Sequence, residues 1–457
     1  MTFGGKFATA LLFLGDIAAC VLALFATLLI RSGTLPGWDV FLYHLVPFSA
    51  VFALWVLVFF MAGLYSKRFL FAERVLFGVI LHTQLINMVL AALFFFLVPG
   101  VPITPRASLV LFFGISLALL LLWRLVIFVP LTHPKKTVSA ALIGEGSEVM
   151  ELMRVANENA RLHIKFMLHI PPEEFARDFG ASTKKLEDAG IRLLVVDLEH
   201  NALHPLLPKL YELAFVSPGY RLVDFYDAYE EVFDRVPLSL LEYQWFLKNV
   251  TRAGSRLERA VKRIIDIVGA LFMGVITVLI TPCVALALSL ESRGPVFIAQ
   301  KRLGRFGTRI TCYKFRSMRH HKPSSTEWTT EEARDNPVTS VGNFLRRTSL
   351  DEFPQFVNIL RGELSLIGPR NDIEGLGARL GEAIPYYNLR YIVKPGITGW
   401  AQINQRYEPG AISPQSIEDT RLRLAYDFYY IKHRSLALDL VIALKTVKRM
   451  LFRVSNW

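Results

Sequence analysis

The sequence is poor in cysteine and lacks the short motifs that identify several common classes of enzyme. Its 457 residues include only three cysteines, Cys20, Cys283 and Cys312, which lie far apart and form no C-x-x-C pair. Neither a disulfide framework nor a zinc site is therefore indicated. No H-E-x-x-H, P-loop or nucleophilic serine motif is present. We interpret His320 and His321, which have no second pair of ligands, as part of a polar loop.

The sequence is also less polar than that of an ordinary soluble domain. Apolar residues make up 53% of the chain, whereas soluble domains contain about 45–50%. This composition excludes a disordered chain and argues against a purely soluble enzyme. The length leaves room for a membrane region and at least one packed soluble domain.

Four runs with almost no charge fill the first third of the sequence, at residues 7–30, 40–65, 75–98 and 107–129. Each is long enough to cross a bilayer, so we predict a four-helix transmembrane bundle over residues 1–135. The first run is too long for a cleaved signal peptide and should remain as an anchor. Basic residues near the ends of the runs favour a cytoplasmic location for both ends of the bundle, with Arg31 and Arg106 on one side and Lys6, Lys67, Arg68, Arg74, Lys135 and Lys136 on the other.

Two ionisable residues, Asp16 and Arg124, lie within these apolar runs. Such residues either serve a function or have a structural role, as a buried pair or as side chains that snorkel to the end of a helix, and we favour the structural role.

The pattern of residues 136–255 predicts a cytoplasmic α/β Rossmann-like domain. Residues 138–143 and 191–198 are expected to be buried strands, 148–160 a helix, and 220–226 a third strand. A Gly144-Glu145-Gly146-Ser147 turn follows the first strand, but the third glycine of a dinucleotide fingerprint is missing. We favour a structural turn over nucleotide binding, and we interpret residues 243–255 as a linker.

A fifth apolar run, residues 264–290, has basic residues on both sides and Pro282 near its middle. Proline removes a hydrogen bond to Val278, so we predict a break at Thr281 and Pro282, with Thr281 bonding back to Thr277. A broken helix with two basic ends favours a re-entrant segment, which would make the following domain monotopic. The alternative is a fifth spanning helix.

All of the net charge of +12 lies in the last 202 residues, which hold 30 Lys and Arg against 18 Asp and Glu. This imbalance indicates a polyanionic partner, which could be nucleic acid, an anionic membrane surface or a phosphorylated small molecule.

The same region contains a dense series of motifs that decides among these partners. They are Gly294-Pro295-Val296, Gln300-Lys301-Arg302-Leu303-Gly304, Tyr313-Lys314-Phe315-Arg316-Ser317-Met318, the segment 346–355 with Asp351-Glu352, Leu364 to Arg370 and Lys394 to Trp400. This series resembles the bacterial sugar transferases, the monotopic phosphoglycosyl transferases, over essentially all of residues 257–457. The bundle and the α/β domain resemble the upstream part of the long-form members. One departure is Asn371, which stands where the family usually has a second proline.

The resemblance implies a membrane helical bundle, an α/β Rossmann-like domain and, over residues 256–457, a mainly α monotopic catalytic domain with a re-entrant helix. It implies an undecaprenyl-phosphate sugar phosphotransferase of the bacterial inner membrane, with its catalytic domain on the cytoplasmic face. The partners would be a UDP-sugar, undecaprenyl phosphate and membrane lipid, with no nucleic acid, and a homo-oligomer would be compatible. The products would be undecaprenyl-diphosphate sugar and UMP, in the first membrane step of exopolysaccharide, capsule or O-antigen (lipopolysaccharide) synthesis.

Asp351 and Glu352 are the candidate catalytic residues. Read from the residues alone, Ser349 and Glu352 form a capping box, or Asp351 itself caps a helix. In either case the helix terminus should lower the pKa of the carboxyl groups and keep Asp351 ionised as a nucleophile. Within the resemblance, Lys314, Arg316 and Arg370 are the cations expected to bind the diphosphate, and Mg²⁺ is the expected cofactor with Glu352 as its ligand.

Residues 436–454 have an amphipathic helical pattern with a basic face. They could pack on the catalytic domain or lie in the lipid interface, and we favour the interface.

The rivals to a phosphotransferase are a non-catalytic scaffold that senses nucleotide sugars through the α/β domain, and an enzyme that transfers the sugar alone and releases UDP. An intact Asp351-Glu352 pair weighs against the scaffold.

Overall fold

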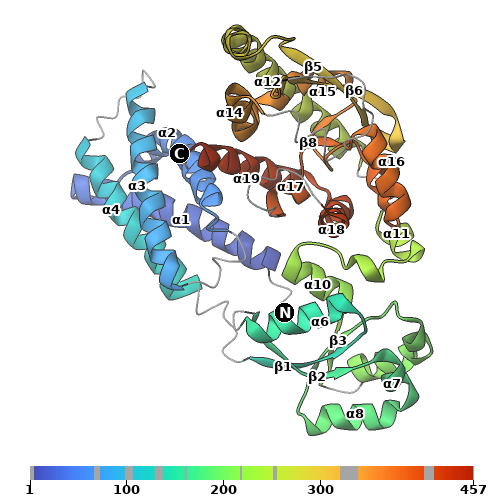
Figure 1. The fold of residues 1–457 in the computed structure, drawn as a ribbon. Coiled ribbons are helices and arrows are strands. Elements are labelled where there is room, and N and C mark those ends of the chain that lie inside the picture. Colours follow the sequence, from blue (N-terminus) through green and yellow to red (C-terminus); the bar gives the residue numbers. More distant parts are fainter. Residues whose placement is uncertain are drawn as a thin grey trace.

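The computed structural model describes residues 5–65, 73–97, 106–128, 137–159, 162–216, 219–250, 255–319, 338–405 and 416–455. Figure 1 shows three parts that follow one another along the chain. A blue bundle of long helices comes first, an α/β unit in green follows, and a mixed unit in yellow to red completes the chain.

The N-terminal bundle contains α1 (Gly5–Ser32), α2 (Trp38–Met61), α3 (Glu73–Leu97) and α4 (Arg106–Leu121), which continues as the π-helical segment η1 (Leu122–Phe128). All four apolar runs therefore form helices that are long and apolar enough to cross a membrane. Of the two structural arrangements expected for Asp16 and Arg124, the buried pair is the one observed. Arg124 donates to both carboxylate oxygens of Asp16, from Nε at 3.0 Å and from Nη2 at 2.5 Å, and both side chains are buried. The basic residues at positions 67, 68, 135 and 136, used to predict topology, lie outside the described residues.

The α/β unit is built on a parallel four-stranded sheet with strand order β2-β1-β3-β4. Its strands are β1 (Val138–Ile143), β2 (Ile164–Ile170), β3 (Leu193–Val196) and β4 (Arg221–Asp224). Alternate residues of β1 are buried on opposite faces. One face packs against α6 (Ser147–Glu158) and α10 (Phe225–Phe233). The other packs against α7 (Pro172–Arg177), α8 (Phe179–Asp188) and the segment η3 (Asn201–Leu206), α9 (Leu207–Tyr211) and η4 (Glu212–Val216).

Two expectations for this unit were incomplete or wrong. Strand β2 was not predicted. It is an edge strand of the sheet, and its first four residues are alternately buried and exposed. The predicted linker instead contains the helix α11 (Tyr243–Asn249), which follows the short turn η5 (Leu238–Leu240). Trp245 and Phe246 of α11 are buried, because they pack against the C-terminal half of the chain. Their burial, which single-residue propensity does not reveal, stabilises this helix.

The fifth apolar run forms one long helix, α12 (Arg256–Glu291), which is also long and apolar enough to cross a membrane. It begins with a capping box between Ser255 and Glu258. The helix continues through Pro282, where a break was expected. The predicted back-bond is present, with the Thr281 hydroxyl donating to the Thr277 carbonyl at 2.6 Å. This bond does not replace the one that Pro282 removes, whose acceptor would be the Val278 carbonyl, and back-bonds of this kind tend to bend a helix.

The remaining elements form a compact layer along α12. They include the antiparallel hairpin of β5 (Phe297–Leu303) and β6 (Arg309–Phe315), which are joined by η6 (Arg305–Gly307), and the short parallel pair β7 (Ser365–Ile367) and β8 (Gly396–Thr398). The helical elements are α14 (Ser340–Thr348), η7 (Leu350–Gln355), α15 (Phe356–Arg361), α16 (Glu374–Ala383), η8 (Tyr387–Ile392), α17 (Trp400–Asn404), α18 (Ile417–His433) and α19 (Leu436–Ser455).

The amphipathic C-terminal helix α19 packs on this layer. Ile442 is fully buried, and Asp439 forms an ion pair with Lys262 of α12 at 2.5 Å. Lys445 lies over the ring of Trp400. One face of α19 is thus part of the protein core, whereas Leu440 and Val447 are exposed on another face. The structure thus shows that one face of α19 packs on the catalytic domain. The exposed face is the part of the helix that remains for the predicted contact with lipid.

Candidate active site

Asp351 and Glu352 lie in the first turn of the short 3₁₀ helix η7, directly after α14. The capping box proposed for this segment is wrong. Ser349 has a left-handed backbone conformation, with φ of 57°, and its side chain makes no capping hydrogen bond. The alternative, in which Asp351 is the cap, is also not observed, because Ser349 occupies that position. The sharp turn at Ser349 leaves both carboxylates available for other partners.

Glu352 is buried and forms the centre of a cluster of charged side chains. Its Oε1 accepts hydrogen bonds from Lys314 Nζ and from Arg370 Nη2, both at 2.6 Å, and its Oε2 accepts from Arg370 Nη1 at 3.2 Å. Lys314 comes from β6 and Arg370 from the segment after β7. Burial alone would favour the neutral acid, but Arg370 and Lys314 hold the pKa of Glu352 well below its usual range. Glu352 is therefore a fixed anion that positions two cations.

Asp351 has the opposite electrostatic environment. Burial and the adjacent negative charge of Glu352 raise its pKa to about 6, even though Lys314, Arg370 and Arg346 act in the other direction. We expected the helix terminus to lower this pKa, and that expectation is wrong, because desolvation and a like charge outweigh the terminus. At neutral pH the carboxylate is still mostly ionised. Among the described residues, no side chain donates a hydrogen bond to it.

The structure brings four of the five expected polar residues together, and Arg316 is the exception. Its guanidinium is buried and donates to Ser292 Oγ and to the carbonyl groups of Ser292, Arg293 and Arg319. Two of these carbonyls follow the C-terminal end of α12, so Arg316 ties this helix end to β6. Sequence spacing could not distinguish this contact from one to a substrate.

A close approach of two backbone segments holds Arg370 in place. Gly368 precedes it, and Gly396 lies opposite on β8. A Cβ atom on Gly396 would lie 2.1 Å from the Gly368 nitrogen, so a larger residue would force the strands apart. The next residue, Asn371, is buried, and its backbone and side-chain oxygens both accept hydrogen bonds from Arg302 Nη1 at 2.9 Å. Asn371 therefore gives Arg302 a side-chain acceptor that the usual proline would lack.

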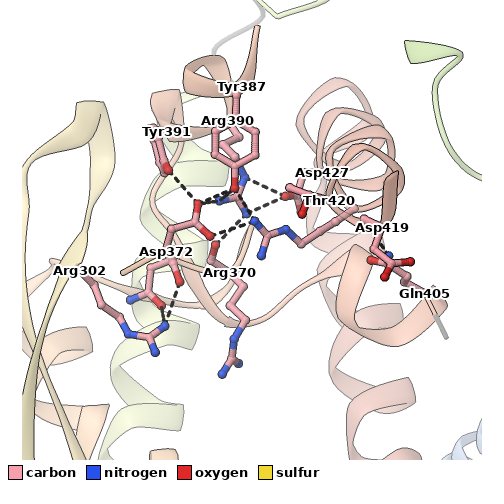
Figure 2. A network of polar contacts seen from close by, with 12 residues as sticks. Arg302, Arg370, Asp372, Tyr387, Arg390, Tyr391, Gln405, Asp419, Thr420 and Asp427 are labelled. Atoms are coloured by element: carbon pink, nitrogen blue, oxygen red, sulfur yellow. Dashed lines mark hydrogen bonds and ion pairs between the residues drawn. The ribbon is translucent and has the colours of Figure 1, made fainter. Parts of the chain in front are cut away.

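Behind Arg370 lies a buried ionic network that sequence analysis did not identify (Figure 2). The carboxylate of Asp372 accepts hydrogen bonds from Tyr387, Tyr391, Arg390 and Arg423. Arg390 also pairs with Asp427 of α18 at 2.7 Å and donates to the Arg370 carbonyl at 2.8 Å. Figure 2 shows the Arg370 side chain pointing away from this network. The backbone of Arg370 is thus fixed from one side while its guanidinium binds Glu352 on the other.

The charged cluster contains carboxylates that could bind Mg²⁺, the cofactor that the resemblance implies. This ion usually takes one or two protein carboxylates and completes its shell with water and phosphate oxygens. Asp351 and Glu352 offer two adjacent carboxylates, and no group of three His, Cys, Asp or Glu side chains that could hold a metal occurs in the described part of the chain. The residues therefore fit a magnesium ion shared with a phosphate ligand, with Glu352 already bonded to Lys314 and Arg370.

The Gly144–Gly146 turn of the α/β unit has an acidic surrounding. Asp197 directly follows β3, and Asp224 is the last residue of the neighbouring strand β4. Burial and the charges of Asp227 and Asp197 raise the pKa of Asp224 to about 7. The side chain of Glu148, in the first turn of α6, accepts hydrogen bonds from Ser239. Acidic side chains beside the turn do not favour the binding of a phosphate group. This agrees with our interpretation of residues 144–147 as a structural turn.

Comparison with known proteins gives a match over the C-terminal part of the chain. Residues 257–453 match the family described as "Bacterial sugar transferase". A UDP-glucose:undecaprenyl-phosphate glucose-1-phosphate transferase from Escherichia coli is 43% identical over 198 residues, which cover 42% of this chain and 40% of that protein. A UDP-N-acetylgalactosamine-undecaprenyl-phosphate N-acetylgalactosaminephosphotransferase from Aeromonas hydrophila is 38% identical over 191 residues, covering 42% and 44%.

A shorter relative is matched over almost its full length. The exopolysaccharide production protein PSS of Rhizobium leguminosarum is 34% identical over 202 residues, which cover 43% of this chain and 98% of that protein. The chain therefore spans less than half the length of the two transferases above, but nearly all of this shorter protein.

Proposed function

Since this chain belongs to the bacterial sugar transferase family, we propose that it transfers a sugar 1-phosphate from a UDP-sugar to undecaprenyl phosphate and releases UMP. The observation that supports this proposal best is the cluster in which Asp351, largely ionised at neutral pH, lies beside two cations held by Glu352. The names of the relatives supply the substrate classes. The step would begin exopolysaccharide, capsule or O-antigen synthesis.

The reaction would proceed in two displacements at the same phosphorus atom. A carboxylate oxygen of Asp351 attacks the phosphorus next to the sugar and forms a new phosphorus–oxygen bond. The bond to the oxygen of UMP breaks, and UMP departs with the electron pair. An oxygen of undecaprenyl phosphate then attacks the phosphosugar on Asp351, and the aspartate carboxylate is released.

Lys314 and Arg370 are placed to interact with the phosphoryl oxygens in both displacements. Together with Asp351 and Glu352 they have a net charge of zero, so the negative charges of a diphosphate are not compensated by these four side chains. A bound Mg²⁺ would supply the missing positive charge and would be held by Glu352, which leaves Asp351 as the nucleophile. Because Arg316 is engaged at the end of α12, we assign it a structural role rather than substrate binding.

We also propose that the catalytic unit lies on the cytoplasmic face of the inner membrane and that α12, which is not broken at Pro282, is re-entrant by bending at this proline. One stripe of α12 is buried against the catalytic layer along most of its length, from Asp266 to Leu288. Most of its other surface exposes large apolar side chains, including Leu257 and Leu290 near the two ends. A helix that spans the membrane would be surrounded by lipid, whereas α12 is covered on one side by the catalytic layer along most of its length. This difference supports the monotopic arrangement.

The identity of the released nucleotide tests this proposal. Purified full-length protein should release UMP from a UDP-sugar when undecaprenyl phosphate is supplied, and the lipid product should contain the sugar phosphate. Release of UDP would identify the alternative enzyme that transfers the sugar alone. Absence of any turnover with several UDP-sugars would favour the scaffold.

A further inference from the structure

A third buried cation, Arg302 of β5, lies beside the charged cluster and takes no part in the chemistry described above. Its side chain belongs to a residue that is only 8% exposed. In the β5–β6 hairpin, Arg302 pairs with Ile310 and Gln300 pairs with Cys312. Paired residues of antiparallel strands lie on the same face, and side chains alternate between the two faces. Arg302 and Gln300 therefore share the face of the hairpin that carries Lys314.

The guanidinium of Arg302 is held by neutral oxygen atoms. Nε and Nη2 donate to Gln300 Oε1 at 3.1 and 2.8 Å, and Nη1 donates to the backbone and side-chain oxygens of Asn371, both at 2.9 Å. Within the described part of the chain, no carboxylate forms an ion pair with Arg302. The carboxylate of Asp372, which follows Asn371, pairs with two other arginines (Figure 2). Because a guanidinium stays protonated in proteins, Arg302 keeps a positive charge that no contacting anion compensates.

The charged cluster is close enough to sense this charge. Asn371 directly follows Arg370, so its contacts place Arg302 beside the backbone of that residue. Burial and the charge of Arg370 lower the pKa of Arg302, whereas the charge of Glu352 raises it. Burial also lowers the pKa of Lys314, against the effect of Glu352, and the charge of Arg302 lowers it further. Arg302 therefore belongs electrostatically to the same cluster.

This third cation changes the charge balance of the site. Lys314, Arg370 and Arg302 are three cations, and Asp351 and Glu352 are two carboxylates, so the five side chains have a net charge of +1. A buried charge acts over a longer distance than a charge in water, because the protein interior screens it less. Since Nε, Nη1 and Nη2 of Arg302 already donate within the protein, its charge can attract an anion without a direct contact.

We propose that Arg302 is a third cation of the diphosphate site, which attracts the nucleotide sugar through its charge while Gln300 and Asn371 hold it in place. The inference rests on the proposed function for the identity of this ligand. Asn371 is a positioning residue, since its Nδ2 donates to Cys312 Sγ at 3.1 Å and thereby orients the amide oxygen toward Arg302. A neutral amide holds the guanidinium without cancelling its charge, whereas a carboxylate at this position would cancel it.

The test measures the Kd of inorganic pyrophosphate by calorimetry, with the full-length protein in nanodiscs. Arg302→Gln removes the charge, and Asn371→Asp keeps the arginine but pairs it with a carboxylate. Both substitutions should raise the Kd about tenfold or more. Lys301→Gln is the matched control, because it removes one positive charge from an exposed position on the opposite face of β5. It should leave the Kd unchanged, since solvent screens an exposed charge.

Asn371→Ala separates the charge of Arg302 from the packing of Asn371. It removes the side-chain acceptor but keeps the charge, so it should lower the melting temperature and raise the Kd by less than about threefold. An increase as large as that of Asn371→Asp would show that the contact matters rather than the charge, and would overturn the proposal. An unchanged Kd in Asn371→Asp, or an unmodified protein that does not bind pyrophosphate, would overturn it as well.

The first displacement gives a second readout. With a UDP-sugar and no acceptor, each protein molecule should release UMP once, and this UMP burst shows whether a variant is folded. The UDP-sugar concentration that gives half of the maximal burst rate should rise by the same factor as the Kd. If Arg302→Gln gives no burst, Asn371→Asp decides alone. Pyrophosphate contains neither sugar nor lipid, so its Kd still decides the role of Arg302 if the unmodified protein releases no UMP and the proposed function fails.

Discussion

Asp351 and Glu352 are neighbours in the chain, yet their environments shift their pKa values in opposite directions. Glu352 receives hydrogen bonds from two cations and stays ionised. Asp351 is desolvated beside that anion, so its pKa is raised. The fixed anion orients Lys314 and Arg370, and the second carboxylate remains available for attack. This division of roles resembles the general rule that paired acids act differently when their surroundings separate their pKa values.

Asp351→Asn should abolish the UMP burst, with a loss of about a thousandfold or more in turnover. The amide retains the size of the carboxylate but cannot act as the anionic nucleophile. Because the ionised form is disfavoured in the folded protein, its removal should leave the melting temperature equal or higher. Near-normal turnover by the purified variant would contradict the nucleophile assignment.

The pH dependence of the burst follows from the same carboxyl group. Below the pKa of about 6 for Asp351, the nucleophile is protonated, so the burst rate should fall about tenfold per pH unit and should be constant above about pH 7. Measurement between pH 4 and 8 locates the midpoint. Glu352→Gln should move it to lower pH in whatever activity remains, since the anion that raises the pKa is gone. A midpoint near the ordinary aspartate value of 3.8 in the unmodified protein would show that Asp351 does not control this step.

At the scale of elements, α12 connects the chemistry to the membrane. Its 36 residues correspond to about 54 Å of helix. Packing contacts run along this length, with Ser365 bonded to Asp266 near one end and Leu345 packed with Leu288 near the other. The helix is therefore part of the catalytic unit, and its exposed apolar face is the surface left for lipid.

The re-entrant placement of α12 predicts that both of its ends are on the cytoplasmic side. Cysteines introduced at Ser255, which caps the helix, and at the exposed Arg309 can be treated with an impermeant reagent in intact cells, after Cys283 has been replaced by serine. Neither position should react until the cells are permeabilised. Reaction at position 309 alone in intact cells would show that α12 spans the membrane.

At the scale of the whole molecule, the α/β unit and the catalytic unit share a continuous apolar core. Phe246 of α11 contacts Phe428 of α18 with ring centroids 5.1 Å apart. Glu230 of α10 pairs with Lys432 and His433 at the end of the same helix. Since α18 also carries Asp427 of the buried network, the α/β unit supports the element that fixes the backbone of Arg370.

This shared core predicts that a substitution in the α/β unit destabilises the catalytic unit. Phe246→Ala should cost about 3–5 kcal/mol. It should lower the temperature at which the UMP burst is lost, together with the melting temperature of the full-length protein. Gln244→Ala, at an exposed position on the same helix, is the matched control and should change neither. If Phe246→Ala lowers the melting temperature but leaves the thermal loss of the burst unchanged, the two units unfold independently.

The sequence by itself determined the apolar helices, the buried central strands, the presence of Asp16 and Arg124 within apolar runs, and the motifs containing Lys314, Asp351, Glu352 and Arg370. These follow from local patterns, namely long apolar runs, strand-length hydrophobic segments and charges within apolar runs. Contacts between distant segments were decided only in the tertiary structure. Because of these contacts, the predicted linker contains the helix α11, Arg316 binds the end of α12, and the pKa of Asp351 is raised where we expected it to be lowered. The physical reason is that burial and the partners of a charged group depend on which segments pack together, and one-dimensional spacing does not contain that information.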